Sequence, residues 1–175
     1  GQIPIARYAN LIEFALLEHY GGTWIDSTVY LTDPIPDMIL NSDFFAVRNS
    51  LLLIDNPVLY PAWFLHAKKG NKTIREIRNV AFAYWLKNKH VIEYLLPNLI
   101  ITLVVKSNPE FEQEIPYMNS DYSEYLVKAL ADEYSEEKWN WIKKLTGIHE
   151  LTYKLDAAVN RKDSFYQHII AEKNK

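Results

Sequence analysis

The sequence predicts an α/β protein with a small sheet and a largely helical C-terminal part. Residues 8–32 have the pattern of a helix, a Gly-Gly break and a strand, and residues 43–49 have the composition of a second strand. Beyond residue 72, apolar residues recur mostly at helical spacing. We therefore expect one domain over residues 1–175, with an α/β core in 1–67 and a mostly helical part in 68–175.

The first helix is predicted to be largely buried. Its apolar face follows the i, i+3, i+4, i+7 pattern and consists of Tyr8, Leu11, Ile12, Ala15, Leu16 and His19. Phe14 and Leu17 make this face wider. Asn10 and Glu13 are three residues apart and share one helix surface. Gly21 suits the left-handed conformation that ends a helix, and Gly22 lets the chain turn directly into a strand.

The predicted strand carries one acid in an apolar setting. Trp24 and Asp26 point to the same side of an alternating stretch, residues 23–31. An ionised carboxylate there would lose several kcal/mol of solvation unless it met a cation, hydrogen-bond donors or an open cleft. A carboxylate beside Gly-Gly suits a divalent metal ion or a sugar hydroxyl, whereas bonding to nearby backbone amides in a turn is the structural alternative.

The other elements are predicted from periodicity and turn residues. Residues 60–67 fit either a strand or a short buried helix, and Pro97 is expected to kink or split the segment 91–105. Further helices are predicted at 37–40, 74–89, 110–114, 123–134, 135–146 and 164–173.

Composition excludes several classes of function. The net charge of −3 and a pI near 6.0 argue against a nucleic-acid partner. The absence of cysteine excludes disulfides and thiolate metal sites and fits a reducing cytoplasm. The segment 91–105 is too short and too polar to span a bilayer, and no signal peptide is visible. The histidines show no i, i+4 pair, which argues against a zinc hydrolase.

The run ANLIEFALLEHYGGTWIDSTVYLTDPIP resembles the sugar-binding segment of bacterial capsular polysaccharide synthesis proteins, relatives of the DxD glycosyltransferases. The matching residues are Leu17, Tyr20, Gly21, Gly22, Trp24 and Asp26. Asn10 and Glu13 stand where the family has Asp and Arg. Residues 63–77, 83–87 and 148–154 resemble the middle and end of the same family, with Glu150 where Lys is more usual.

The resemblance implies a nucleotide-sugar-dependent glycosyltransferase that builds capsular or cell-surface polysaccharide at the cytoplasmic face of the membrane. It implies the C-terminal part of a glycosyltransferase A-type, Rossmann-like fold, because the first helix begins too early for the nucleotide-binding strands to precede it. The implied partners are a nucleotide sugar and a saccharide acceptor, with peripheral association at the membrane.

The resemblance also implies site residues. The donor sugar would be bound by Asn10, Gly21, Gly22, Trp24 and Asp26; the diphosphate by His149 and Lys154; and a divalent Mn²⁺ or Mg²⁺ by Asp26 and His149. The family leans toward retention of configuration, but no catalytic base can be chosen among Asp33, Asp43 and Asp55. The alternative is a non-catalytic descendant or a helical binding module, in which Asn10 and Glu13 record the loss of the donor site.

Overall fold

The computed structural model describes residues 5–50, 55–88, 90 and 92–173 and divides the chain into two compact units. Unit 1 contains residues 1–26 and 36–119, and unit 2 contains residues 27–35 and 120–175. The architecture is mixed α/β with small sheets, in agreement with the predicted class. The A-type glycosyltransferase fold and the single-domain organisation stay predictions.

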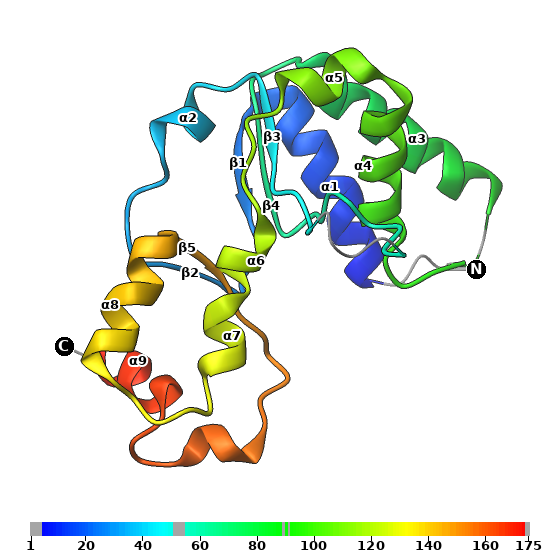
Figure 1. The fold of residues 1–175 in the computed structure, drawn as a ribbon. Helices are drawn as coiled ribbons and strands as arrows, with labels where there is room; N and C mark the ends of the chain where they lie inside the picture. The colour runs from blue at the N-terminus through cyan, green and yellow to red at the C-terminus, as the bar shows by residue number, and fades with distance from the viewer. Residues whose placement is uncertain (1–4, 51–54, 89, 91, 174–175) are drawn as a thin grey trace. The chain divides into compact units, whose positions relative to one another are not determined.

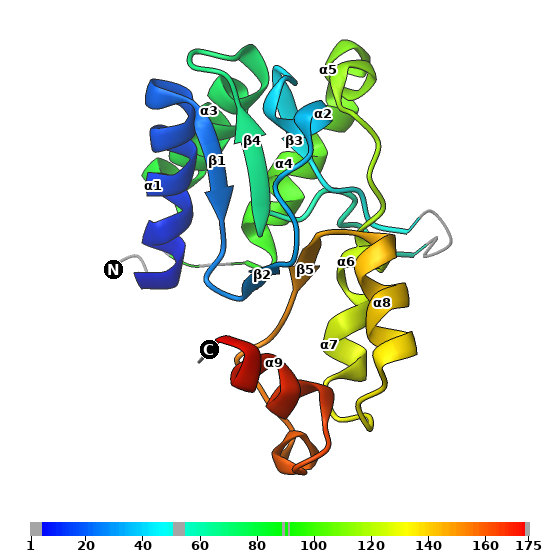
Figure 2. The ribbon, with the colours of Figure 1, turned by 90° about the vertical axis from the view of Figure 1, so that its left-hand side faces the viewer.

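Unit 1 is built on a three-stranded antiparallel sheet with strand order β1-β4-β3. The strands are β1 (Gly22–Ile25), β3 (Phe44–Ala46) and β4 (Phe64–Ala67), so the undecided segment 60–67 contains a strand. Figures 1 and 2 show α1, α3 and α4 on one side of this sheet. The helices of unit 1 are α1 (Ile5–Tyr20), α2 (Asp37–Leu40), α3 (Lys72–Lys87), α4 (Leu96–Ser107) and α5 (Pro109–Glu114).

Helix α1 buries a different face from the one predicted. Leu11, Phe14 and Leu17 join the core cluster, whereas Tyr8 and Ile12 are exposed, as are Leu16 and Tyr20. The prediction of a largely buried helix was therefore wrong. The apolar pattern is wide enough to fit two faces, and α3 and the sheet together cover only the one centred on Phe14.

Pro97 begins a helix instead of kinking one. Helix α4 starts at Leu96, which places Pro97 in its first turn, where a missing backbone N–H leaves no helical hydrogen bond unmade. The buried residues of α4 pack into the same core as Leu65 and Ala67 of β4. The apolar composition of 96–105 thus reflects a core helix.

Unit 2 combines a two-stranded antiparallel sheet with short helices. Strand β2 (Val29–Leu31) pairs with β5 (Ile148–Glu150), with Tyr30 opposite His149. The helices are α6 (Ser120–Ser123), α7 (Tyr125–Ala129), α8 (Glu136–Leu145), the 3₁₀ helix η1 (Ala157–Asn160) and α9 (Phe165–Lys173). The single helix predicted at 123–134 was therefore wrong, and the helices predicted at 135–146 and 164–173 are confirmed.

The predicted strand 23–31 is divided between the two sheets. The N–H of Asp26 donates to the carbonyl of Trp63 at 2.9 Å, which extends the β1–β4 ladder by one residue. The chain then turns at Ser27 and Thr28, and Val29 enters the sheet with β5. Asp26 consequently lies at a bend and not in the middle of a strand.

Candidate functional site

The carboxylate of Asp26 is held by the side chain of Trp24. The indole Nε1–H donates to Asp26 Oδ1 at 2.9 Å, as expected for two residues on the same side of an extended chain. Within the described residues, no hydrogen bond reaches Oδ2, and the side chain is half-buried. Burial raises the pKa of Asp26, and the bond from Trp24 lowers it. Asp26 therefore offers one oriented, unoccupied oxygen to a ligand.

A second carboxyl group, that of Glu13, lies within electrostatic reach of Asp26. Glu13 is completely buried in α1, and Asn10 Nδ2 donates to its Oε2 at 3.0 Å. Its Oε1 has no hydrogen-bond partner in the described part of the chain. Burial raises the pKa of Glu13, the bond from Asn10 lowers it, and the charge of Asp26 raises it further. Burial therefore shifts Glu13 toward its neutral form.

Sequence reasoning did not place Glu13 among the site residues. The spacing from Asn10 to Glu13 signalled that the two side chains meet on the helix surface, but not that Glu13 would be completely buried. The structure joins Asn10, Glu13, Trp24 and Asp26 into one cluster in unit 1.

The Glu13→Gln variant should be more stable than the wild type at alkaline pH. A folded-state pKa above the ordinary value of 4.5 costs stability progressively as the pH rises above 4.5, because the buried group resists ionisation. Glutamine keeps an acceptor for Asn10 and does not ionise. Thermal melts at about pH 4.5 and about pH 8 should show a larger gain at the higher pH. Glu76→Gln, at an exposed acid of α3, is the control, and an equal gain in both variants would contradict the prediction.

In unit 2, His149 is a buried, neutral imidazole. Its Nε2 lies 3.0 Å from Thr32 Oγ1, and its ring lies 6.3 Å from Tyr30 and 6.4 Å from Trp139, measured between centroids. Among the described residues, Nδ1 is buried without a hydrogen-bond partner. Burial lowers the pKa of His149 from 6.5 to about 4, against the charge of Asp33, which raises it. An uncharged, enclosed ring contributes no positive charge to a diphosphate.

Folding stability should fall with acid because of His149. A depressed folded-state pKa confers stability that is complete above 6.5 and lost as the pH falls toward about 4. The loss amounts to at most about 3.5 kcal/mol, at about 1.4 kcal/mol per pKa unit. His149→Gln should flatten this dependence in denaturant titrations between these two pH values. His90→Gln, at an exposed histidine, should not, and a parallel loss in wild type and His149→Gln would contradict the assignment.

Lys154 is exposed after β5, with its Nζ 5.7 Å from the centre of the Tyr153 ring. No salt bridge of its ammonium group with another described residue occurs. Asp26 belongs to unit 1, whereas His149 and Lys154 belong to unit 2. The convergence of these three side chains on one donor site stays a prediction.

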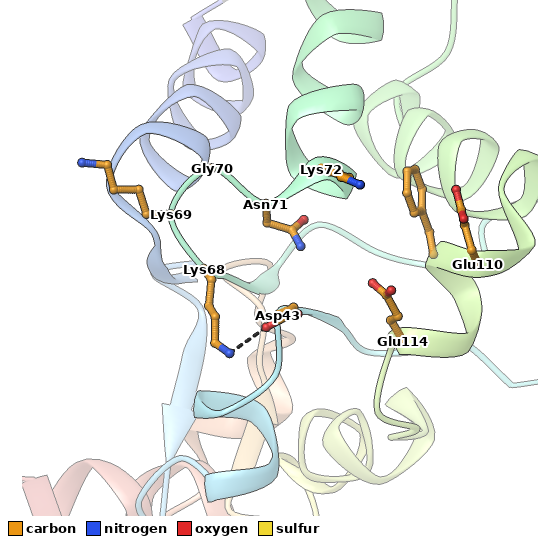
Figure 3. A pocket seen from close by; sticks show the side chains of 9 residues that line it. Asp43, Lys68, Lys69, Gly70, Asn71, Lys72, Glu110 and Glu114 are labelled. Atoms are coloured by element: carbon orange, nitrogen blue, oxygen red, sulfur yellow. Dashed lines mark hydrogen bonds and ion pairs between the residues drawn. The ribbon is translucent and has the colours of Figure 1, made fainter.

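A polar cavity of about 430 Å³ lies elsewhere in unit 1 (Figure 3). It is bounded by the residue before β3, the turn after β4, the start of α3, and α5; its lining includes Asp43, Lys68, Lys69, Lys72, Glu110 and Glu114. Lys68 Nζ and Asp43 Oδ1 are 2.6 Å apart, and the three lysines are balanced by three acids.

The register of β1 on β4 places Gly22 beside Ala67 at this end of the sheet and Ile25 beside Phe64 at the other. Asp26, which follows Ile25, therefore lies at the opposite end of the sheet from this cavity.

The family of the chain follows from a comparison over nearly its whole length. A family model described as capsular polysaccharide synthesis protein matches residues 1–169. The chain belongs to this family. A search of curated proteins finds no match to the chain. The resemblance predicted from the YGGTWID motif is thus confirmed, and membership of the capsular polysaccharide synthesis family indicates a role in capsule biosynthesis.

The predicted metal site of this capsular polysaccharide synthesis protein fits its two residues unequally. Asp26 has one carboxylate oxygen that no described residue bonds, the type of ligand that Mg²⁺ and Mn²⁺ prefer. His149 presents no accessible nitrogen, because one is bonded to Thr32 and the other is buried. No group of three or more His, Asp or Glu residues that could hold a metal occurs among the described residues. A metal at Asp26 would therefore need most of its ligands from a diphosphate and water.

Proposed function

We propose that the protein is a glycosyltransferase that moves a sugar from a nucleotide-sugar donor onto a growing capsular polysaccharide. Membership of the family supports the role in capsule synthesis. The observation that carries the reaction type is the Asp26 carboxylate, which follows the Gly21–Gly22 corner, is oriented by Trp24 and has one oxygen without a partner in the described part of the chain.

Glycosyl transfer needs charge stabilisation at two places. The sugar acquires oxocarbenium character while negative charge grows on the departing diphosphate. When bound, Mn²⁺ or Mg²⁺ would neutralise that growing charge. Asp26 would hold the metal ion or accept hydrogen bonds from donor hydroxyls, with its orientation fixed by Trp24. Lys154 would offer a further cation to the diphosphate.

The raised pKa of Glu13 bears on donor binding. An ionised carboxylate beside Asp26 would repel a diphosphate, and burial shifts Glu13 toward its uncharged form, which weakens that repulsion. Asn10 donates a hydrogen bond to the Glu13 carboxyl group. Its remaining amide donor and acceptor groups could then bind a sugar hydroxyl.

We propose that the protein acts at the cytoplasmic face of the cell membrane. None of the helices in the described residues is long and apolar enough to cross a bilayer. We propose peripheral association of the protein, which would give it access to a membrane-borne acceptor.

A non-catalytic member of the family is the second candidate. It is favoured by Glu13, an acid at a position where the resemblance to the family implies an Arg. In this case the Asn10–Glu13 bond would be a structural contact of a saccharide-binding or scaffolding protein.

Donor hydrolysis distinguishes the two candidates. The full-length protein is incubated with a panel of UDP- and GDP-sugars, with Mn²⁺ and with a chelator, and release of nucleotide is measured. The transferase predicts turnover of one donor that is lost in Asp26→Ala, whereas Asp37→Ala, at an exposed acid of α2, keeps it. Failure to turn over any donor would favour the non-catalytic member, and equal turnover in Asp26→Ala would overturn the assignment of Asp26 to the donor site.

A further inference from the structure

The polar cavity of unit 1 contains charged side chains that the fold does not pair. Its volume of about 430 Å³ lies in the range of small-molecule sites, roughly 300–1,000 Å³. Lys68 is paired with Asp43. The side chains of Lys72, Glu110 and Glu114 are exposed, and none of them forms a hydrogen bond or ion pair with another described residue. These three groups can therefore meet a ligand in the cavity.

The two sides of the cavity offer opposite kinds of hydrogen-bonding group. The start of α3 supplies donors, namely the ammonium group of Lys72 and the amide nitrogen of Asn71, whose carbonyl oxygen already caps the helix. Helix α5 supplies acceptors, the carboxylates of Glu110 and Glu114, which are four residues apart on one helix surface. Figure 3 shows Asn71 and Glu114 on facing sides of the cavity, whereas Lys69 points away from them. A ligand between the two sides must both accept and donate hydrogen bonds.

Both sides of the cavity are fixed by contacts outside it. Glu112, which lies between the two acids of the cavity on α5, accepts from Lys106 Nζ at 2.8 Å and from Tyr60 Oη at 3.0 Å. The N–H of Gly70 donates to the carbonyl of Glu18 at 2.8 Å, which ties the turn before α3 to the end of α1. The cavity is therefore preformed, and binding does not require its walls to be ordered first.

The charges and the lining favour a saccharide over other ligands. A phosphate-type anion would meet two carboxylates beside the ammonium group of Lys72. A metal ion lacks a cluster of three or more His, Asp or Glu residues in the described part of the chain. A peptide is usually anchored by apolar pockets, and the lining contains a single aromatic ring, that of Phe111. Sugar hydroxyls donate to carboxylates and accept from ammonium and amide groups, in charge-assisted hydrogen bonds.

We propose that the polar cavity binds an uncharged, hydroxyl-rich segment of the growing capsular polysaccharide. Asn71 and Lys72 donate to its oxygens, and Glu110 and Glu114 accept from its hydroxyl groups. The cavity is separated from Asp26 by the length of β1, about 10 Å at about 3.3 Å per residue. It is therefore a second saccharide site, which holds a part of the polymer away from the reacting end.

This inference rests on the proposed function for the identity of its ligand, but it does not depend on Asp26. Saccharide binding is measured without a nucleotide sugar. A protein that fails to bind saccharide in the cavity would leave the donor-site proposal standing, and a protein that fails to turn over a donor would leave the cavity proposal standing.

The test is isothermal titration calorimetry of the full-length protein with size-fractionated oligosaccharides, released by mild acid from the capsular polysaccharide of the source strain. We expect the fragments to bind, with an affinity that changes little with salt, because an uncharged ligand leaves little attraction to screen. Lys72→Ala/Glu114→Ala should lower the affinity roughly tenfold or more, since two charge-assisted hydrogen bonds are lost. Glu110→Gln/Glu114→Gln should also lower it, because neutral acceptors bind hydroxyl groups less strongly.

The matched control is Glu76→Ala/Lys87→Ala, which removes one exposed acid and one exposed lysine of α3 outside the cavity. It should bind the fragments like the wild type, and circular dichroism should show that all the double variants are folded. The proposal is overturned if the wild type binds no fragment or if the control loses as much affinity as Lys72→Ala/Glu114→Ala. It is also overturned if salt abolishes binding, if Glu110→Gln/Glu114→Gln binds more tightly, or if the cavity variants release a bound protein without changing fragment binding.

Discussion

Replacing Asp26 by asparagine should reduce donor turnover by at least about 100-fold while leaving the protein as stable as the wild type or more so. Asparagine keeps the size of the side chain and an oxygen for the Trp24 indole, but it removes the negative charge on which a cation would depend. Burial raises the pKa of Asp26, so the ionised form costs stability at neutral pH. Loss of activity with an unchanged or higher melting temperature separates a functional role from a structural one.

Two further variants sharpen this result. Trp24→Phe removes the indole N–H that orients Asp26, and it should reduce turnover by a smaller factor, about tenfold, with Asp26 still present. Asp37→Asn, in the first turn of α2, should leave turnover unchanged. An Asp26→Asn protein with wild-type turnover would show that the carboxylate is only a structural group at the bend.

The Gly21→Ala substitution should destabilise the protein by about 3 kcal/mol or more, equivalent to a fall in melting temperature of roughly 6–12 °C. Gly21 has a φ of 73°, and a Cβ built there would lie 2.6 Å from the backbone nitrogen of Lys69. Two backbone segments meet at this point, because the N–H of Gly21 donates to the carbonyl of Leu17 at 2.9 Å and the N–H of Gly70 donates to the carbonyl of Glu18 at 2.8 Å. The side chain could be accommodated only by moving the turn after β4 away from the end of α1.

Gly70 provides the matched control, since its φ of 71° is nearly the same and the nearest atom to its Cβ would be the Arg75 Nη2 at ordinary contact distance, 3.6 Å. Gly70→Ala should therefore show only the conformational cost of the left-handed region, about 1–2 kcal/mol. Differential scanning calorimetry of both variants measures the difference. Equal losses in the two variants would mean that backbone conformation, and not the close approach to Lys69, makes Gly21 necessary.

The site was predictable to the extent that it depends on neighbours in the sequence. The Gly-Gly corner and the i, i+2 pairing of Trp24 with Asp26 depend on local backbone geometry, and the structure contains both. The contact between Asn10 and Glu13 follows from helix geometry in the same way. Burial of Glu13 was not predictable, because it depends on which face of α1 is covered by α3 and the sheet.

By itself, the sequence determined the family, the mixed α/β class and most of the helices, because these depend on motifs and on apolar periodicity within single segments. Only the tertiary structure decided that the strand after Gly22 divides at Asp26 between two sheets, since the β4 and β5 partners lie roughly 40 and 120 residues further along the chain. Tertiary packing also enclosed His149 and left the wide apolar surface of α1 half-exposed. Burial depends on which surfaces meet, and a periodic pattern within one segment does not specify its partner.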